Sequence, residues 1–235
     1  MNNQQSTIVF DEKTAASYDK KTDLWAPGRE ALFSFMRMIL AELPADARIL
    51  CVGVGTGTEL IALAQAFPQW QFAAVEPAPA MLEVCRRKAE ESGVASRCTF
   101  HEGYLDSLPT TEPFDAATCL LVSHFFTQPE ERSDFFHQIA LRLRPKGILI
   151  SSDLVLGMAP SAYQSLLKVW FRMLEASGWT EEEMGKVRAA YGHSIAALTT
   201  SEIESVIAAG GFDAPVLFFQ TLLIHAWYSR RSASN

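Results

Sequence analysis

Short apolar segments alternate with longer amphipathic stretches along the first two thirds of the chain. Apolar segments with the length of strands occur at 49–52, 71–75, 98–101, 116–122 and 148–152. The stretches between them place apolar residues at helical spacing, so each helix would present one apolar face to a sheet. This alternation predicts parallel strands covered by helices on both faces of the sheet.

The pattern changes after residue 153. Helical spacing is found at 163–176, 181–191 and 201–209, and two apolar segments at 216–219 and 222–228 are expected to pair antiparallel at the sheet edge. We therefore expect an α/β fold with a Rossmann-like, doubly wound, mostly parallel seven-stranded sheet, an antiparallel terminal strand and a helical lid insertion. A single domain is expected over 1–235, with an N-terminal helical lid segment at 1–45 and the helical insertion at 156–200.

One helix of the parallel region has a strong start signal. Thr127 is followed three residues later by Glu130, the pattern of a capping box in which each side chain binds a backbone N–H of the other residue. Phe136 and Ile139 then fall on one face of the helix. The spacing predicts a helix with Thr127 as its N-cap, ending before the apolar segment at 148–152.

A glycine-rich turn follows the first apolar segment. Gly53, Gly55 and Gly57 allow the backbone to turn sharply and to approach a ligand closely. The helix that comes next would point its free N–H groups at that ligand. A dinucleotide fingerprint needs a third glycine or alanine three residues after the second, but Thr58 and Leu60 occupy the corresponding positions. The spacing therefore favours a nucleotide-like ligand other than NAD or FAD.

An acidic residue ends the second apolar segment. Glu76 lies 19 residues beyond Gly57, where a carboxylate can accept hydrogen bonds from both hydroxyls of a ribose. The alternative is that the glycines and the acid are ordinary features of an α/β protein, because isolated motifs are weak signals. The two features together favour a nucleotide-like ligand that contains a ribose.

These residues and the strand order resemble class I S-adenosylmethionine-dependent methyltransferases over nearly the whole chain. The resemblance implies that S-adenosylmethionine is the cofactor, with the glycine turn against its methionine part, the strand-two acid on the ribose, and the residues after strand three at the adenine. The cofactor-binding residues expected on this basis are Gly53, Gly55, Gly57, Glu76, Met81, Tyr104, Leu105, Leu120 and Tyr18.

A narrower resemblance is to carboxy-S-adenosylmethionine synthase, a methyltransferase relative that places a carboxyl group, supplied by prephenate, on the cofactor's methyl carbon. The colinear segments that carry it lie at 10–13, 27–28, 79–81, 85–87, 129–132, 178–181 and 219–220. In that family a basic residue grips the added carboxylate, and Arg188 stands at the matching place. Such a contact would be a charge-assisted hydrogen bond.

The chain departs from these relatives at four positions. Cys51 stands where many methyltransferases have an acid that orders the glycine turn and helps to place the cofactor's amino group. Tyr104 stands where many have an acid that accepts from the adenine amino group. Arg29 and Leu121 replace a tyrosine and an asparagine of the synthase. These positions bear on how tightly, and in which form, the cofactor is held.

Methyl transfer from a sulfonium is an in-line displacement, so holding the nucleophile close to the methyl carbon in a dry pocket can supply much of the catalysis. An amine or thiol needs no general base. For a hydroxyl or an acidic carbon, His124 is the expected base, because it follows the fourth strand, where the methyl group should point. The alternative is a partly buried structural histidine.

Aromatic and basic residues outside the sheet are candidates for the acceptor site. Tyr18 lies in a segment that in this family often folds over the cofactor, and Trp25 would close the same mouth. Arg188 and Tyr191 belong to the insertion and are candidate acceptor contacts together with Trp25. The alternative for all of them is packing within the lid.

Asp153 is expected to be no more than the polar end of a strand.

Composition limits the partners. The net charge of −7 disfavours binding of nucleic acid, which needs clustered Lys and Arg. No apolar segment approaches the ~20 residues of a membrane span, and the N-terminal sequence does not have the pattern of a signal peptide, so we expect a cytoplasmic protein. Cysteines at 51, 85, 98 and 119 form no C-x-x-C pair, so neither a metal site nor a disulfide framework is expected. The partner expected is a small-molecule substrate, and the narrower resemblance implies a homodimer.

Three functions remain open from the sequence. The first is a methyltransferase that uses S-adenosylmethionine on a small-molecule acceptor, favoured by the glycine turn, Glu76 and the insertion. The second is a cofactor-modifying enzyme like the carboxyl synthase, favoured by the colinear segments and Arg188. The third is a non-catalytic binding module, to which Cys51 and Tyr104 point.

Overall fold

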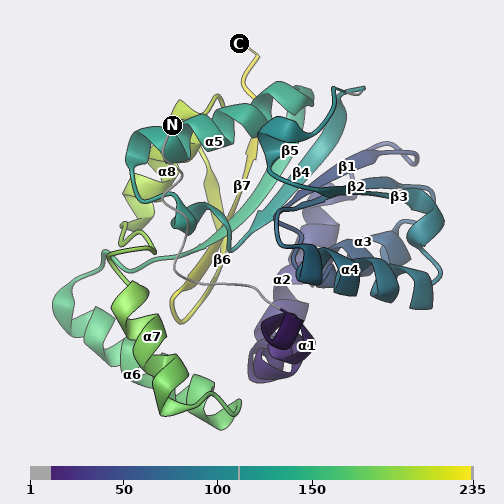
Figure 1. Cartoon of the computed structure of the whole chain (residues 1–235). Coiled ribbons are helices and arrows are strands. Elements are labelled where there is room, and N and C mark those ends of the chain that lie inside the picture. Colours follow the sequence, from purple (N-terminus) through teal and green to yellow (C-terminus); the bar gives the residue numbers. More distant parts are fainter. Residues whose placement is uncertain (1–11, 111, 234–235) are drawn as a thin grey trace.

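The computed structural model describes residues 12–110 and 112–233. It contains a seven-stranded sheet in the order β3-β2-β1-β4-β5-β7-β6. The strands are β1 Arg48–Val52, β2 Gln71–Glu76, β3 Cys98–Glu102, β4 Phe114–Leu120, β5 Leu143–Leu154, β6 Val216–Thr221 and β7 Ile224–Arg230. Pairing is parallel from β3 through β5 and antiparallel for β5 with β7 and β7 with β6. The predicted fold class is therefore confirmed (Figure 1).

Helices cover both faces of this sheet. The helices of the described residues are α1 Glu12–Lys21, α2 Ala26–Leu40, α3 Thr58–Ala66, α4 Pro79–Glu91, α5 Pro129–Arg142, α6 Pro160–Ala176, α7 Glu181–Ala190 and α8 Thr200–Ala209, with short 3-10 helices η1 Asp23–Trp25, η2 Ala95–Arg97, η3 Leu105–Ser107 and η4 Ser123–Phe125. Leu32, Leu60 and Leu82 bring α2, α3 and α4 into one core layer. Phe136 and Ile203 bring α5 and α8 into the layer on the opposite face.

The expected N-terminal lid segment divides into parts with different surroundings. Its first eleven residues, including the start of the segment at 10–13, lie outside the described residues. The helix α2 buries Leu32, Phe33, Met36 and Leu40, so it contributes to the core of the sheet.

The helices α6 and α7 lie away from the sheet, beyond the ends of β5 and β7 (Figure 1). Phe171 and Met184 from these helices form a separate apolar cluster with Leu154, Leu223 and Ile224 at the sheet's end. This part of the chain therefore has a small core of its own. None of the described helices is both long and apolar enough to cross a membrane.

The start of α5 differs from the prediction. Thr127 is not its N-cap; the helix begins at Pro129, with Gln128 as an N-cap that makes no side-chain cap hydrogen bond. Proline is well suited to the first helical position because its missing N–H has no partner there in any case. Capping boxes occur instead at the N-termini of α7 and α8, formed by Thr180 with Glu183 and by Thr199 with Glu202.

The strand β4 ends at Leu120 rather than at residue 122. Leu121 adopts a φ of +57°, in the left-handed region that residues other than glycine rarely occupy, and its N–H donates to Ser152 O at 2.9 Å. The chain therefore turns sharply just before η4. Strain of this kind is concentrated at functional sites when the surrounding structure holds it in place.

The glycine turn packs directly on α4, which gives a test of the fold. Gly57 has a φ of +79°, and a Cβ there would clash with Sγ of Cys85. Gly93 has a φ of +68° with nothing within 4 Å of a Cβ. Gly93→Ala should therefore lose only about 1–2 kcal/mol of unfolding free energy, from the left-handed backbone. Gly57→Ala should lose about 1–3 kcal/mol more, from overpacking.

Urea unfolding of the two single variants, of Cys85→Ala and of the double variant Gly57→Ala/Cys85→Ala measures both contributions. The double variant should be more stable than the sum of the single losses predicts, because shortening Cys85 makes room for the new methyl group. Strictly additive losses would show that Cys85 does not limit the turn.

Candidate functional site

The three glycines of the turn all have positive φ. The values are 64° at Gly53, 55° at Gly55 and 79° at Gly57. Gly53 N and Val54 N both donate to Val75 O, at 2.8 and 3.1 Å, which ties the end of β1 to β2. Gly57 is the N-cap of α3. The first N–H groups of this helix are therefore directed out of the turn, where an anionic or polar ligand group is favoured.

Glu76 joins the turn from the end of β2. Its Oε2 accepts a hydrogen bond from Gly55 N at 2.9 Å, and its Oε1 accepts one from Ala78 N at 3.0 Å. Burial raises the pKa of Glu76, while these two hydrogen bonds oppose the rise. Each carboxylate oxygen has a further lone pair. The structure thus brings the predicted acid and the glycine turn together in one hydrogen-bonded unit.

The helix α1 is docked over this turn by Asp19. Asp19 Oδ1 accepts a hydrogen bond from Thr56 Oγ1 at 2.7 Å, and Asp19 Oδ2 pairs with Lys88 Nζ at 2.8 Å. Lys88 also donates to Thr58 Oγ1 at 3.2 Å. Tyr18, on the same helix, has a pKa raised by burial and by the nearby acids Asp19, Glu59 and Glu76.

Cys51 is completely buried in β1. Burial, followed by the charge of Glu59, raises the pKa of the Cys51 thiol well above its ordinary value. Burial raises the pKa of Glu59 to about 7, against the opposing effects of hydrogen bonds from backbone N–H groups and of the charge of Lys88. Glu59 lies in the first turn of α3. Its nearness to Cys51 escaped the sequence analysis, although a glutamate two residues after the last glycine was visible.

The expectation for Asp153 was wrong, because this residue is the centre of a buried polar cluster. Asp153 is 1% exposed, and its carboxylate pairs with Arg132 and accepts hydrogen bonds from Ser123 and from His124 Nδ1, the latter at 2.7 Å. Arg132 Nε also donates to Ser123 Oγ at 2.9 Å. Burial alone would raise the pKa of Asp153, but Arg132, His124 and Ser123 outweigh it and lower the pKa below its ordinary value. The carboxyl group is therefore held ionised.

Arg132 was also missed as a member of the site. It is completely buried on α5, on the same face as Phe136 and Ile139. An arginine on an apolar helix face was a visible signal, since buried charges are nearly always paired. Its partner could not be found from the sequence because Asp153 lies 21 residues away on a different element.

His124 is held between the end of β4 and the chain that follows α7. It is 4% exposed, and its carbonyl oxygen accepts a hydrogen bond from Ala196 N at 2.8 Å. The turn before it contacts the glycine turn, because a Cβ at Gly53 would lie 2.5 Å from Val122 Cγ2. The structure therefore supplies the partner that sequence reasoning lacked, namely Asp153.

The residues expected near the adenine and the methionine part are spread around the same sheet edge. Met81 is buried on α4, and its Cε would lie 3.7 Å from a Cβ at Gly55. Leu105 is buried in η3, and its carbonyl oxygen accepts from Arg142 Nη2 at 2.6 Å. Tyr104 is 51% exposed just before η3, and Leu120, partly buried, is the last residue of β4.

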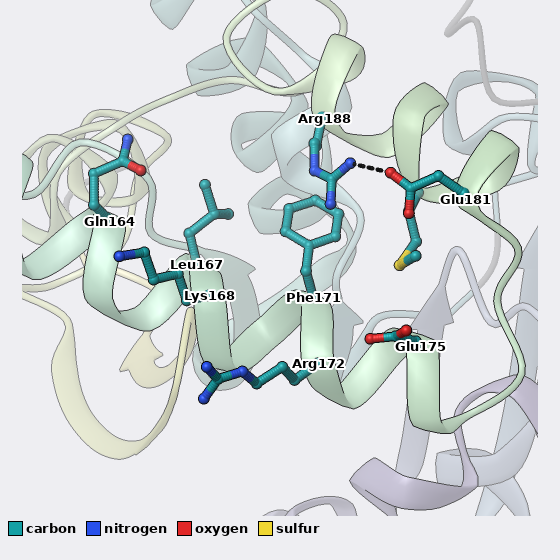
Figure 2. A pocket seen from close by; sticks show the side chains of 9 residues that line it. Gln164, Leu167, Lys168, Phe171, Arg172, Glu175, Glu181 and Arg188 are labelled. Atoms are coloured by element: carbon teal, nitrogen blue, oxygen red, sulfur yellow. Dashed lines mark hydrogen bonds and ion pairs between the residues drawn. The ribbon is translucent and has the colours of Figure 1, made fainter.

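The predicted acceptor residues Arg188 and Tyr191 lie at the C-terminal end of α7. Arg188 pairs with Glu181 at 2.8 Å, and its guanidinium lies 4.2 Å from the ring centroid of Phe171. Figure 2 shows this arrangement in a groove of about 460 Å³ between α6 and α7. Tyr191 packs in the lid core, 6.4 Å from Phe171 between ring centroids. These contacts of Arg188 and Tyr191 are with residues of α6 and α7, and none of them is with the glycine turn.

Trp25 lies where the sheet core and the lid meet. It packs against both apolar clusters, the one containing Leu32 and the one containing Phe171. Its indole Nε1 is buried and has no hydrogen-bond partner within residues 12–110 and 112–233.

In the same ranges no group of three His, Cys, Asp or Glu side chains is arranged to hold a metal ion.

Comparison with known proteins agrees with this geometry. Residues 49–147 match a family model described as a methyltransferase domain. Carboxy-S-adenosyl-L-methionine synthase of Campylobacter jejuni is 26% identical over 208 residues, which cover 86% of this chain and 85% of the relative. The enzyme of the same name from Desulfotalea psychrophila is 21% identical over 214 residues, 90% of this chain and 86% of the relative.

Two solved methyltransferases have the same fold. An O-methyltransferase family protein from Burkholderia thailandensis superposes with a TM-score of 0.62 at 15% identity, covering 99% of this chain and 66% of that one. The CurJ carbon methyltransferase superposes with a TM-score of 0.65 at 14% identity, covering 95% of this chain and 59% of that one. The chain thus spans less than two thirds of the length of either solved structure.

The fold is that of S-adenosylmethionine-dependent methyltransferases, and residues 49–147 match a methyltransferase domain. This confirms the predicted resemblance to the class I superfamily and the predicted cofactor, S-adenosylmethionine. The narrower resemblance, to carboxy-S-adenosylmethionine synthases, is confirmed as well, at low identity.

The raised pKa of Glu59 predicts how stability depends on pH. The folded protein keeps this proton up to about pH 7, whereas the unfolded chain loses it near the ordinary pKa of 4.5. Between these values the folded state binds more protons, so the contribution of Glu59 to the unfolding free energy falls as pH rises. The fall should amount to at most about 3 kcal/mol, at 1.36 kcal/mol per pKa unit.

Urea unfolding at pH 5 and pH 8 measures this effect. The wild-type protein should lose more stability between these pH values than Glu59→Gln, which has no proton to lose. The matched control is Glu83→Gln on α4, because the Glu83 side chain is 71% exposed. Equal losses in wild type and Glu59→Gln would show that the Glu59 carboxyl is not held protonated.

Proposed function

We propose that this protein is an S-adenosylmethionine-dependent methyltransferase that acts on a hydroxyl group or an acidic carbon of a small molecule. The observation that carries the proposal is the buried His124–Asp153 pair, 2.7 Å between Nδ1 and Oδ1, at the end of β4 next to the glycine turn. Such a pair supplies what these acceptors need and an amine or thiol does not, namely a general base.

The buried cluster prepares His124 for this role. Asp153 is ionised and can only accept, so Nδ1 of His124 carries the ring proton and Nε2 is left with a free lone pair. Arg132 keeps Asp153 ionised and fixed in position. Nε2 would then accept the proton of the acceptor as its oxygen or carbon attacks, and the positive charge on the imidazole would be stabilised by Asp153.

S-adenosylmethionine supplies an electrophilic methyl group when it is bound. The residues proposed to hold it are Gly53, Gly55, Gly57, Glu76, Met81, Tyr104, Leu105, Leu120 and Tyr18. The free lone pairs of the Glu76 carboxylate support a role on the ribose hydroxyls. The docking of α1 over the turn through Asp19 supports exclusion of water from the methionine part.

The acceptor would lie between Trp25, the lid and His124. The unpartnered Trp25 Nε1, among the described residues, is a donor that a polar acceptor could satisfy. We extend the proposal to a lid made of α1 with the insertion at 156–200. A cytoplasmic location and a homodimer stay predictions.

A second candidate function is supported by the names of the curated relatives. Carboxy-S-adenosyl-L-methionine synthases match 86% of the chain at 26% identity. In this function Arg188 would bind the added carboxylate in place of Glu181, its partner in the lid. The third possibility, a non-catalytic module, would have no use for a buried base at His124.

Calorimetric titration followed by mass spectrometry tests the proposal. The purified protein should bind S-adenosylmethionine and S-adenosylhomocysteine, and Glu76→Ala should weaken both. Incubation with S-adenosylmethionine and a panel of phenols and activated carbon acids should yield a product heavier by one methyl group. A retained cofactor heavier by one carboxyl group would support the second candidate, and no binding to either compound would reject both functions.

The role of His124 predicts a dependence on the acceptor. His124→Asn should lower kcat for a phenol by about 100- to 10,000-fold, the usual contribution of a general base. The affinity for S-adenosylmethionine should stay unchanged, and any methylation of a thiol in the panel should fall much less. His137→Asn on α5 is the control. A uniform loss for phenols and thiols would indicate that His124 is structural.

A further inference from the structure

The methionine part of S-adenosylmethionine carries an α-ammonium group, and this chain does not offer it an acid from β1. Cys51, at the position where an acid was expected, is buried, and its thiol is kept neutral by a raised pKa. If the glycine turn bound this ammonium group with no acid nearby, the positive charge would be uncompensated in a partly dry site.

Glu59 is the acid that the fold brings to the same place. It is 9% exposed in the first turn of α3, two residues after Gly57. Its charge acts on Cys51 in β1, on Cys85 in α4 and on Tyr18 in α1, so the carboxyl group lies among the elements that surround the glycine turn.

The surroundings leave Glu59 without a cation of its own. Among the described residues Glu59 forms no ion pair within 4 Å, and the nearby Lys88 is bound to Asp19 and Thr58 instead. Asp19 is a poorer candidate, because its charge is already paired with Lys88. A buried acid without a cationic partner is costly unless a ligand supplies one.

We infer that Glu59 replaces the missing acid of β1 and binds the α-ammonium group of the cofactor's methionine part. This inference rests on the proposed function and deepens it, since it assigns a positioning residue to the cofactor site. Binding of the ammonium group would give this buried acid the cationic partner that it lacks, through a charge-assisted hydrogen bond. The alternative is an acid that only stabilises the N-terminus of α3.

Two ligands distinguish binding of the ammonium group by Glu59 from a role only at the N-terminus of α3. S-adenosylhomocysteine contains the amino and carboxyl groups of the methionine part, whereas 5′-methylthioadenosine contains the adenosine and sulfur but neither of those groups. Glu59→Gln should weaken S-adenosylhomocysteine by about 30-fold or more, the usual loss for one partner of a buried charged pair. It should leave 5′-methylthioadenosine within about twofold of wild type, because that ligand has no ammonium group to lose.

A second variant asks whether the acid can be moved back. In Cys51→Asp/Glu59→Gln the carboxylate returns to β1, and S-adenosylhomocysteine affinity should recover to within about tenfold of wild type. Glu83→Gln is the matched control and should bind both ligands as wild type does. Thermal unfolding of each variant confirms that it is folded before calorimetry.

The outcomes are distinct. If wild type binds S-adenosylhomocysteine and Glu59→Gln binds it equally well, the inference is wrong while cofactor binding stands. If Glu59→Gln weakens both ligands to the same extent, Glu59 has a structural role and the inference is also wrong. If wild type binds neither ligand, the proposed function fails, and the inference fails with it. The comparison of the two ligands does not depend on the double variant.

Discussion

The ion pair between Arg132 and Asp153 is the interaction on which the carboxyl edge of the sheet depends. Both side chains are almost completely buried, and they join α5 to β5. Two charges taken out of water are costly, and the cost is offset only if their remaining hydrogen-bonding groups are also satisfied. Ser123 and His124 partly meet this requirement, and they come from η4. The buried pair therefore determines where the chain must turn after β4, and the left-handed Leu121 is the local cost of that turn.

A second set of contacts connects the glycine turn with α7 through the short helix α1. Asp19 binds the glycine turn, and two residues later Lys21 pairs with Glu183 of α7. Lys21 O also accepts from Trp179 Nε1 at 3.2 Å, and its ammonium lies 5.2 Å from the centroid of that ring. A ligand that shifts α1 over the glycine turn would therefore also shift α7, to which α1 is bound. Cofactor and acceptor would be coupled by these contacts without a long pathway.

Much of the fold follows from local sequence, and much of the site does not. Strand positions and the glycine turn were predictable because alternating apolar segments and glycine spacing are local signals. The capping box at Thr127 was wrong because Pro129 provides a better helix start, and that competition is also local. Asp153 was misjudged for a different reason. Its burial and its partners depend on residues 21 to 30 positions away, which no local pattern records.

Two buried acids of the site, Asp153 and Glu59, have opposite surroundings, and this contrast indicates what each is for. Asp153 has a permanent cation, Arg132, and its pKa is lowered despite complete burial. Burial raises the pKa of Glu59 to about 7, and the nearby cation Lys88, which is bound to Asp19, opposes this rise only in part. An acid whose charge is compensated within the chain organises structure. An acid whose compensation is missing destabilises the free protein at neutral pH, and such a cost is retained where a cationic ligand removes it. On this argument Asp153 prepares the proposed base, His124, and Glu59 is the proposed anchor of the cofactor.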